Sequence, residues 1–145
     1  MVVVPDASVI LKWVLQKEGE PDTPQALELL DAFLNETIEI RLPSLWRYEV
    51  GNILGLKQAA LATALMSALF GYEFQEEPLA QAYCLAVLDH MRGVKGITFY
   101  DSSYHVLALR TEGQYVTADE EYLRKARRKG SIALLADWRA PSASG

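Results

Sequence analysis

The sequence has little of what several classes of protein depend on. Cys84 is its single cysteine, so neither an internal disulfide nor a metal cage built from cysteines is possible. No apolar run reaches the roughly 18 residues of a membrane-spanning helix, and the N-terminus lacks the basic region and cleavage site of a signal peptide. These absences predict a soluble, cytoplasmic protein with no membrane partner.

Positive charge is also scarce, because the 145 residues carry a formal net charge of -5 at pH 7. Affinity for a nucleic-acid backbone usually comes from a surplus of Lys and Arg. The local distribution is different, since basic side chains crowd into residues 124–129. Arg124, Lys125, Arg127 and Arg128, with Lys129 beside them, are candidates for a phosphate-contact surface or a partner-binding patch. A solvated helical face is the alternative interpretation of this cluster.

Length and patterning predict a single α/β domain. Half of the residues are hydrophobic, which is a globular composition, and the chain is too short for two ordinary domains. Short β-branched runs alternate with segments of helical periodicity, which indicates a central parallel sheet of about five strands with helices on both faces. The predicted strands are residues 2–4, 38–42, 97–100, 115–116 and 132–135, with a short edge strand at 72–75. The predicted helices are residues 9–16, 24–35, 45–58, 60–71, 79–91, 101–112 and 120–129. We expect the domain to span residues 1–140 and residues 141–145 to form a disordered tail.

Acidic residues follow three of the predicted strands. Asp6, Asp101 and Asp119 each lie at or just past a strand's carboxyl end, and ligands bind at that edge of an open parallel sheet. Glu49 lies on a predicted helix face with large apolar groups, so its carboxylate needs a partner. Two carboxylates about 4 Å apart repel by roughly 4 kcal/mol at an effective dielectric near 20, so such a cluster requires protons or a cation. Oxygen ligands alone favour Mg²⁺ or Mn²⁺.

Each acid also has a purely structural interpretation. Asp6 could be a turn residue, Asp101 a helix N-cap, and Asp119 a first-turn residue favoured by the helix dipole. Their recurrence at the same end of three strands favours a shared site. His105, one turn after Asp101, is predicted to be a packed helix residue and not a base.

Two hydroxyl side chains stand beside the acids. Ser8 can cap the helix predicted at residues 9–16, and Thr117 with Glu120 fits a capping box. The same hydroxyls could instead support a metal site, and the sequence leaves both roles open.

Four segments carry the acids as an ordered set of motifs. They are Val-Pro-Asp6-Ala-Ser8, Trp-Arg-Tyr-Glu49-Val-Gly-Asn52, Phe-Tyr-Asp101-Ser-Ser-Tyr104 and Val-Thr117-Ala-Asp119. This set resembles the PIN domain, and specifically the short VapC-type toxins of prokaryotic toxin-antitoxin pairs. The resemblance spans residues 2–138, and Pro5 departs from it because a strand residue usually precedes the first acid.

The resemblance implies an Mg²⁺- or Mn²⁺-dependent endoribonuclease that hydrolyses RNA phosphodiesters. Asp6 and Asp101 would bind the metal directly, while Glu49 and Asp119 would act through water or position the nucleophile. It also implies a homodimer, and a small antitoxin protein whose C-terminal segment, often with an Arg, fills the acidic pocket.

Other interpretations remain open at this point. A PIN nuclease of RNA processing would carry the same motifs, and a non-catalytic metal-binding or interaction domain could keep the acids for stability. A phosphatase with an Asp nucleophile would have a second acid where Ser8 stands, and a receiver domain would need a Lys that residues 132–138 lack.

Overall fold

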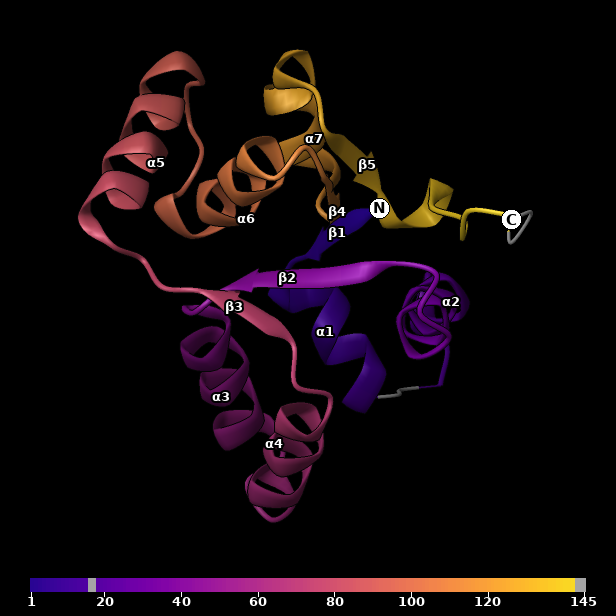
Figure 1. The fold of residues 1–145 in the computed structure, drawn as a ribbon. Coiled ribbons are helices and arrows are strands. Elements are labelled where there is room, and N and C mark those ends of the chain that lie inside the picture. The colour runs from indigo at the N-terminus through magenta and orange to yellow at the C-terminus, as the bar shows by residue number, and fades with distance from the viewer. Residues whose placement is uncertain (16–17, 143–145) are drawn as a thin grey trace.

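Five parallel strands form the centre of the molecule. The computed structural model describes residues 1–15 and 18–142, and in it the sheet has the order β3-β2-β1-β4-β5 (Figure 1). The strands are β1 (Val2–Pro5), β2 (Glu39–Pro43), β3 (Gln75–Glu77), β4 (Gln114–Thr117) and β5 (Ile132–Leu134). Because the chain builds outward from β1 first to one side and then to the other, the strand order reverses between β1 and β4. The carboxyl edge of that pair is therefore the expected place for a ligand.

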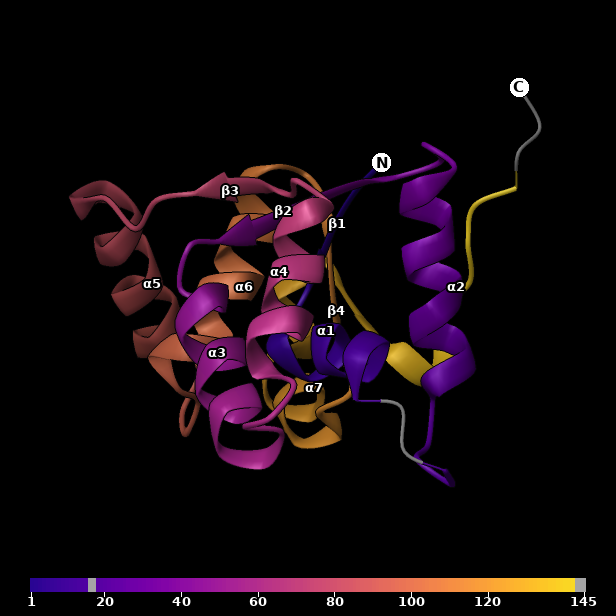
Figure 2. The same ribbon diagram turned by 90° about the horizontal axis from the view of Figure 1, so that it is seen from below.

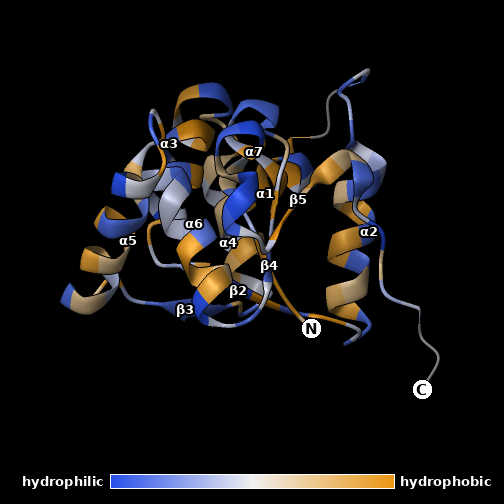
Figure 3. Ribbon diagram, turned by 90° about the horizontal axis from the view of Figure 1, so that it is seen from above, coloured by the Kyte–Doolittle hydropathy of each residue, from blue (hydrophilic) through white to orange (hydrophobic). Residues whose placement is uncertain are grey.

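Helices cover both faces of the sheet, as predicted. In Figure 1, α5, α6 and α7 lie above the sheet and α1, α3 and α4 lie below it, while Figure 2 shows α2 and α5 at opposite ends of the molecule. The helices are α1 (Ala7–Val14), α2 (Thr23–Leu34), α3 (Trp46–Lys57), α4 (Ala62–Gly71), α5 (Gln81–Gly93), α6 (Phe99–Arg110) and α7 (Glu120–Ala126), with 3₁₀ turns at Arg127–Lys129 and Leu135–Asp137. Helix α2 carries both hydrophobic and hydrophilic colour along its length (Figure 3), as expected of an amphipathic helix.

The central strands are apolar because both of their faces are covered. Val3, Val4 and Val116 are fully buried, which explains their unalternating hydrophobic pattern. Pro5 ends β1 and has no N–H to give to the sheet, and the next backbone N–H, from Asp6, donates to the carbonyl of Val116 at 3.2 Å. This bond fixes the backbone of Asp6 against β4.

The strand predicted at residues 97–100 is wrong. Gly96 has a φ of +76°, which turns the chain, and the Thr98 side chain accepts a hydrogen bond from the N–H of Asp101, so helix α6 begins at Phe99. Asp101 is therefore a first-turn helix residue and does not follow a strand.

The fifth strand is instead the edge strand β3, a few residues beyond the predicted 72–75. Its apolar content is low, but Glu76 accepts hydrogen bonds from Trp46 Nε1 at 2.5 Å and from the Arg47 guanidinium on α3. Arg47 lowers the pKa of Glu76, although burial opposes this. These contacts with α3 and the parallel pairing with β2 stabilise β3, although its residues have low β propensity.

The remaining boundaries differ by a few residues. The helix predicted at 9–16 begins at Ala7, and residue 16 lies outside the described residues. The helix predicted at 120–129 changes to a 3₁₀ turn at Arg127. Residues 141 and 142 have no helix or strand and residues 143–145 lie outside the described part, so the predicted boundary near residue 140 and the disordered tail stay predictions. Within residues 1–15 and 18–142, none of the helices has the length and hydrophobicity that crossing a membrane requires.

Candidate active site

Asp6 is buried at the end of β1 and accepts four hydrogen bonds. Its Oδ1 accepts from the N–H of Val9 at 3.2 Å and from Ser8 Oγ at 2.5 Å, and its Oδ2 accepts from the Tyr115 hydroxyl at 2.9 Å and from Thr117 Oγ1 at 2.6 Å. Burial raises the pKa of Asp6, although these hydrogen bonds oppose the rise. Asp6 is itself the N-cap of α1, so the predicted capping role of Ser8 is wrong, and Ser8 instead donates to Asp6.

Asp119 is the N-cap of α7 and is linked to Asp6 through Thr117. Its Oδ1 accepts from the N–H of Tyr122 at 3.0 Å. Thr117 Oγ1 accepts from the N–H of Asp119 at 3.0 Å and donates its own proton to Asp6. The capping box predicted for Thr117 and Glu120 is therefore wrong, because Thr117 connects two of the acids instead of starting the helix.

Asp101 lies in the first turn of α6 and shares a small cleft with Asp119. Burial raises the pKa of Asp101 to about 6, and the negative charges of Asp6 and Asp119 add to the rise. The alternative prediction that Asp101 caps its helix is wrong, since Thr98 is the cap.

Glu49 reaches the same group of acids from the first turn of α3. Its Oε1 accepts from the Tyr104 hydroxyl at 2.6 Å, which is the partner that its position on an apolar face required. Burial raises the pKa of Glu49, and repulsion from Asp101 and Asp6 contributes. Asp101 therefore lies within electrostatic reach of the other three predicted acids.

Sequence reasoning did not identify two tyrosines of this site. Tyr104 and Tyr115 stack with their ring centroids 6.2 Å apart, and their hydroxyls donate to Glu49 and Asp6, respectively. Local signals existed, because Tyr104 lies one helical turn after Asp101 and Tyr115 lies on the same strand face as Thr117.

Among the described residues, no side-chain cation pairs with the four acids. In the part of the chain that the structure describes, no Lys, Arg or His forms an ion pair with Asp6, Glu49, Asp101 or Asp119. Oxygen donors of this kind suit a hard divalent ion. Across residues 1–15 and 18–142, however, no three His, Cys, Asp or Glu side chains are already arranged to hold one. All four lone-pair positions of Asp6 are also in use, so its direct ligation would require the exchange of a hydrogen bond.

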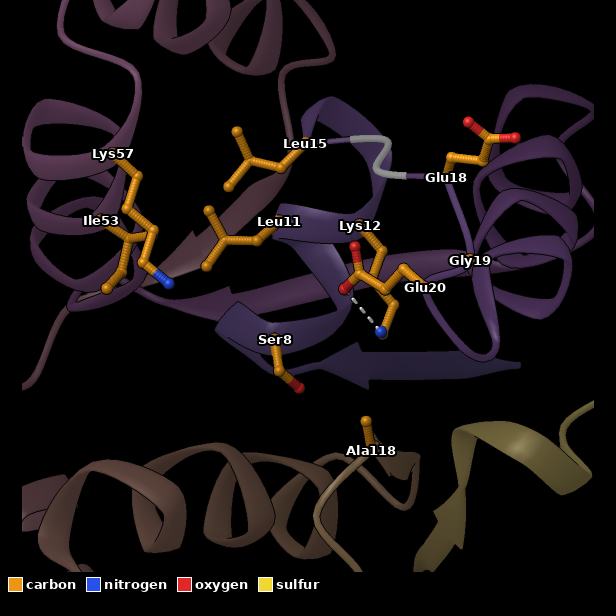
Figure 4. A pocket seen from close by; sticks show the side chains of 10 residues that line it. All are labelled: Ser8, Leu11, Lys12, Leu15, Glu18, Gly19, Glu20, Ile53, Lys57 and Ala118. Atoms are coloured by element: carbon orange, nitrogen blue, oxygen red, sulfur yellow. Dashed lines mark hydrogen bonds and ion pairs between the residues drawn. The ribbon is translucent and has the colours of Figure 1, made fainter.

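A second hollow borders the acids on the α1 side (Figure 4). Ser8 and Ala118 lie at its edge, and its walls include the apolar side chains of Leu11, Leu15 and Ile53 with Lys57 beside them. The hollow therefore combines apolar walls on α1 and α3 with charged side chains around them, namely Lys12, Glu18, Glu20 and Lys57.

The basic cluster lies on α7 and the turn after it. Arg124, Arg127 and Arg128 are exposed, while Lys125 donates to the carbonyl of Gly96 at 2.9 Å and pairs with Glu121 at 3.2 Å. Lys125 also lines the cleft of Asp101, so the cluster adjoins the acids.

His105 packs inside the domain, as predicted. It is fully buried, its Nδ1 lies 2.8 Å from the Tyr122 hydroxyl, and its Nε2 lies 2.7 Å from the carbonyl oxygen of Gly130. His90 Nε2 lies 3.0 Å from the same hydroxyl, so the two histidines and Tyr122 connect α5, α6 and α7.

Fold and site together define a doubly covered parallel α/β domain with acids at the edge where strand order reverses. The family model described as PIN domain matches residues 3–129, and the chain belongs to that family. A solved structure described as "Structure of FitAB bound to IR36 DNA fragment" contains a similar chain, with a TM-score of 0.70 over 96% of this chain and 98% of that one. At 14% sequence identity, this likeness concerns the fold. Comparison with curated protein sequences gave no match.

Proposed function

We propose that this protein is a metal-dependent endoribonuclease and the toxin of a VapC-like toxin-antitoxin pair. The observation that carries the proposal is that Asp6, Glu49 and Asp119 all lie within electrostatic reach of Asp101, without a balancing cation among the described residues. Membership of the PIN-domain family supports it. RNA is the proposed substrate and the cytoplasm the proposed location.

The residues of the site have separable tasks in this proposal. Asp6, held by four donors, fixes Thr117 and through it the backbone of Asp119. Asp101 and Asp119 offer carboxylate oxygens to one cleft, where they would hold the divalent ion. Mg²⁺ or Mn²⁺, when bound, would supply positive charge that offsets the carboxylates and the charge that develops on the phosphate.

Cleavage of RNA tests this function directly. Metal-stripped protein is incubated with total cellular RNA, with and without Mn²⁺, beside the Asp101→Asn variant. We expect cleavage only by the wild type with metal, and a loss of about 10²–10³-fold in the variant, because several kcal/mol of transition-state stabilisation depend on this charge. Equal cleavage by both proteins, or none by either with fresh metal, would contradict the proposal.

Metal binding can be tested without any substrate. At a Mn²⁺ concentration about 100 times its Kd, we expect a stabilisation of about 2.7 kcal/mol and a rise in Tm of roughly 5–10 °C. Asp101→Asn, which retains the Thr98 cap of α6, should lose most of this shift, whereas Glu39→Gln on the exposed side of β2 should keep it. A shift of the same size in all three proteins would show that the metal binds elsewhere.

An antitoxin and a second copy of the chain are the proposed protein partners. The hollow beside Ser8 has apolar walls, charged side chains around them and the acids close by, so a segment with apolar side chains and an Arg could fill it and neutralise the cluster (Figure 4). For the homodimer, Leu85 and Leu88 on α5 are exposed apolar side chains that a partner could cover.

A non-catalytic binding domain is the second candidate, favoured by the lack of a preformed metal cage among the described residues. A PIN nuclease of RNA processing would pass the cleavage test but would not need an antitoxin. Cleavage without growth arrest on expression would favour that role.

A further inference from the structure

A groove lined by basic residues lies beside the acidic cleft. One wall is the turn after α5 and the other is formed by α7 with its 3₁₀ turn. The lining residues are Gly93, Val94, Lys95, Arg124, Lys125, Ala126, Arg128 and Lys129. None of these described residues is acidic, so the groove is locally positive on a protein of net charge -5.

Two glycines let lysine side chains lie close to the loop wall. A Cβ atom added at Gly93 would be 3.0 Å from Lys129 Nζ, and one added at Gly96 would be 3.2 Å from Lys125 Nζ. Both distances are tighter than ordinary contacts, so larger residues here would displace the ammonium groups. The ammonium groups of Lys129 and Lys125 therefore lie close to the backbone at the end of α5 and in the turn after it.

The basic side chains of the groove differ in whether they form ion pairs within the protein. Lys125 and Arg124 both pair with Glu121. Lys95, Arg128 and Lys129 are exposed and form no ion pair with another described residue. These three side chains therefore carry the charge that is available to a ligand.

The groove adjoins the acidic cleft, because Lys125 lines both hollows. Asp101, Asp119 and Glu121 also line the cleft. A chain with regularly spaced negative charges could thus have one phosphate near the acids and the next phosphates in the groove. No aromatic side chain is among the described residues that line the groove, so it offers no stacking surface for bases.

We propose that this groove binds the phosphodiester backbone of the strand that is cut, on one side of the cleavage point, through Lys95, Arg128 and Lys129. The inference rests on the proposed nuclease function and defines where its substrate lies. Arg127 belongs to the same basic run but does not line the groove, so it has no part in this contact. Such binding is independent of sequence and depends on salt.

Binding in the absence of cleavage tests the proposal. Fluorescence anisotropy is measured with a labelled 12-nucleotide oligouridylate in EDTA, using Asp101→Asn as the background. In that background, Lys95→Gln, Arg128→Gln and Lys129→Gln together should lower affinity about 10- to 100-fold and reduce the slope of log K against log salt by about 2, near 0.7 for each lost phosphate contact. Single-stranded DNA of matching length should show the same losses, because the contacts are to the backbone.

The matched control removes three positive charges outside the groove, through Arg92→Gln, Arg127→Gln and Arg139→Gln. We expect it to change the slope by less than about 0.7, the value of one contact. Equal losses in both triple variants would mean that only net charge matters and would overturn the proposal, as would no loss in either. Greater loss of binding to a decaglutamate peptide than to RNA would assign the groove to an acidic protein. If there is no Mn²⁺-dependent cleavage but the two triple variants still differ in RNA binding, the nuclease proposal is contradicted and the proposed role of the groove in backbone binding is kept.

Discussion

Neutralising two acids of the site, by Glu49→Gln together with Asp101→Asn, is expected to raise Tm at pH 7.5 by about 3–6 °C. Both carboxylates have a raised pKa, caused first by burial and then by repulsion within the cluster. The Gln side chain keeps an oxygen that can accept from Tyr104. Both groups are partly exposed, so we expect the free energy of unfolding to rise by only about 1–2 kcal/mol. This value allows for the neutral side chain at position 101, which interacts more weakly with the helix dipole than Asp101 does.

The dependence of this gain on pH is its distinguishing feature. Asp101 has a pKa of about 6 in the folded protein and 3.8 as its ordinary value, so between these pH values the folded state binds more protons than the unfolded state. Its contribution to stability is therefore present below pH 3.8 and is lost as pH rises through 6. The difference in Tm between variant and wild type should be near zero at pH 4 and complete at pH 7.5.

Thermal melts across this pH range provide the measurement. Glu39→Gln removes one negative charge from an exposed position on β2 and should leave Tm within about 1 °C of wild type. A gain that is already present at pH 4, or no gain at pH 7.5, would show that ionisation of these two carboxylates does not destabilise the folded protein.

Removing one hydroxyl, by Tyr122→Phe, is expected to destabilise the protein by about 2–4 kcal/mol and to lower Tm by roughly 5–15 °C. The carbonyl of Gly130 can only accept, so His105 Nε2 carries the proton and Nδ1 accepts from Tyr122. The Tyr122 oxygen then accepts from His90 Nε2. The variant leaves a buried acceptor and a buried donor without their partner.

Tyr72→Phe is the matched control for this prediction. The Tyr72 ring packs 5.6 Å from that of Phe74, and its hydroxyl has no hydrogen bond within the described residues. We expect the control to change stability by less than about 0.5 kcal/mol. Similar Tm values for the two variants would contradict the assigned hydrogen-bond chain.

The same histidines make the wild type sensitive to acid. Burial lowers the pKa of His90 to about 4, and His105 and Lys129 contribute to this decrease. Burial also lowers the pKa of His105, and Lys129 adds to this effect. Between about 4 and 6.5 the unfolded state therefore binds more protons at His90, so its contribution to stability is lost as pH falls through this range. This trend opposes that of Asp101, which is why the variants must be compared with wild type at each pH.

The fold could be predicted where burial dictates the sequence. The valines of β1 and the apolar residues of β4 form continuous hydrophobic runs because helices cover both faces. A strand was wrongly predicted at residues 97–100 because their side chains favour β structure. The turn at Gly96 and the helix cap at Thr98, which start α6 there, were given too little weight. The edge strand was predicted at residues 72–75 and lies instead at Gln75–Glu77, because its position depends on contacts with α3 and β2.

The candidate site could be predicted in part from the sequence. The acids stand out as polar residues at the ends of apolar segments, and the family match supports the ordered motif set. Their supporting contacts could not be predicted, because the hydroxyl of Tyr115 meets Asp6 across 109 residues. Only the tertiary fold shows that the hydrogen bonds of Asp6 are already filled.

The position of β1 at the middle of the sheet affects how the protein is made. Asp6 is synthesised well before Thr117, which binds it and follows 111 residues later. At about 5–20 residues per second, a ribosome needs roughly 5–20 s to cover that interval. Throughout this time the nascent chain lacks β4, Thr117 and Asp119. A growing or truncated chain therefore cannot assemble the acidic cleft, and any activity that depends on it begins only once β4 and α7 have left the ribosome.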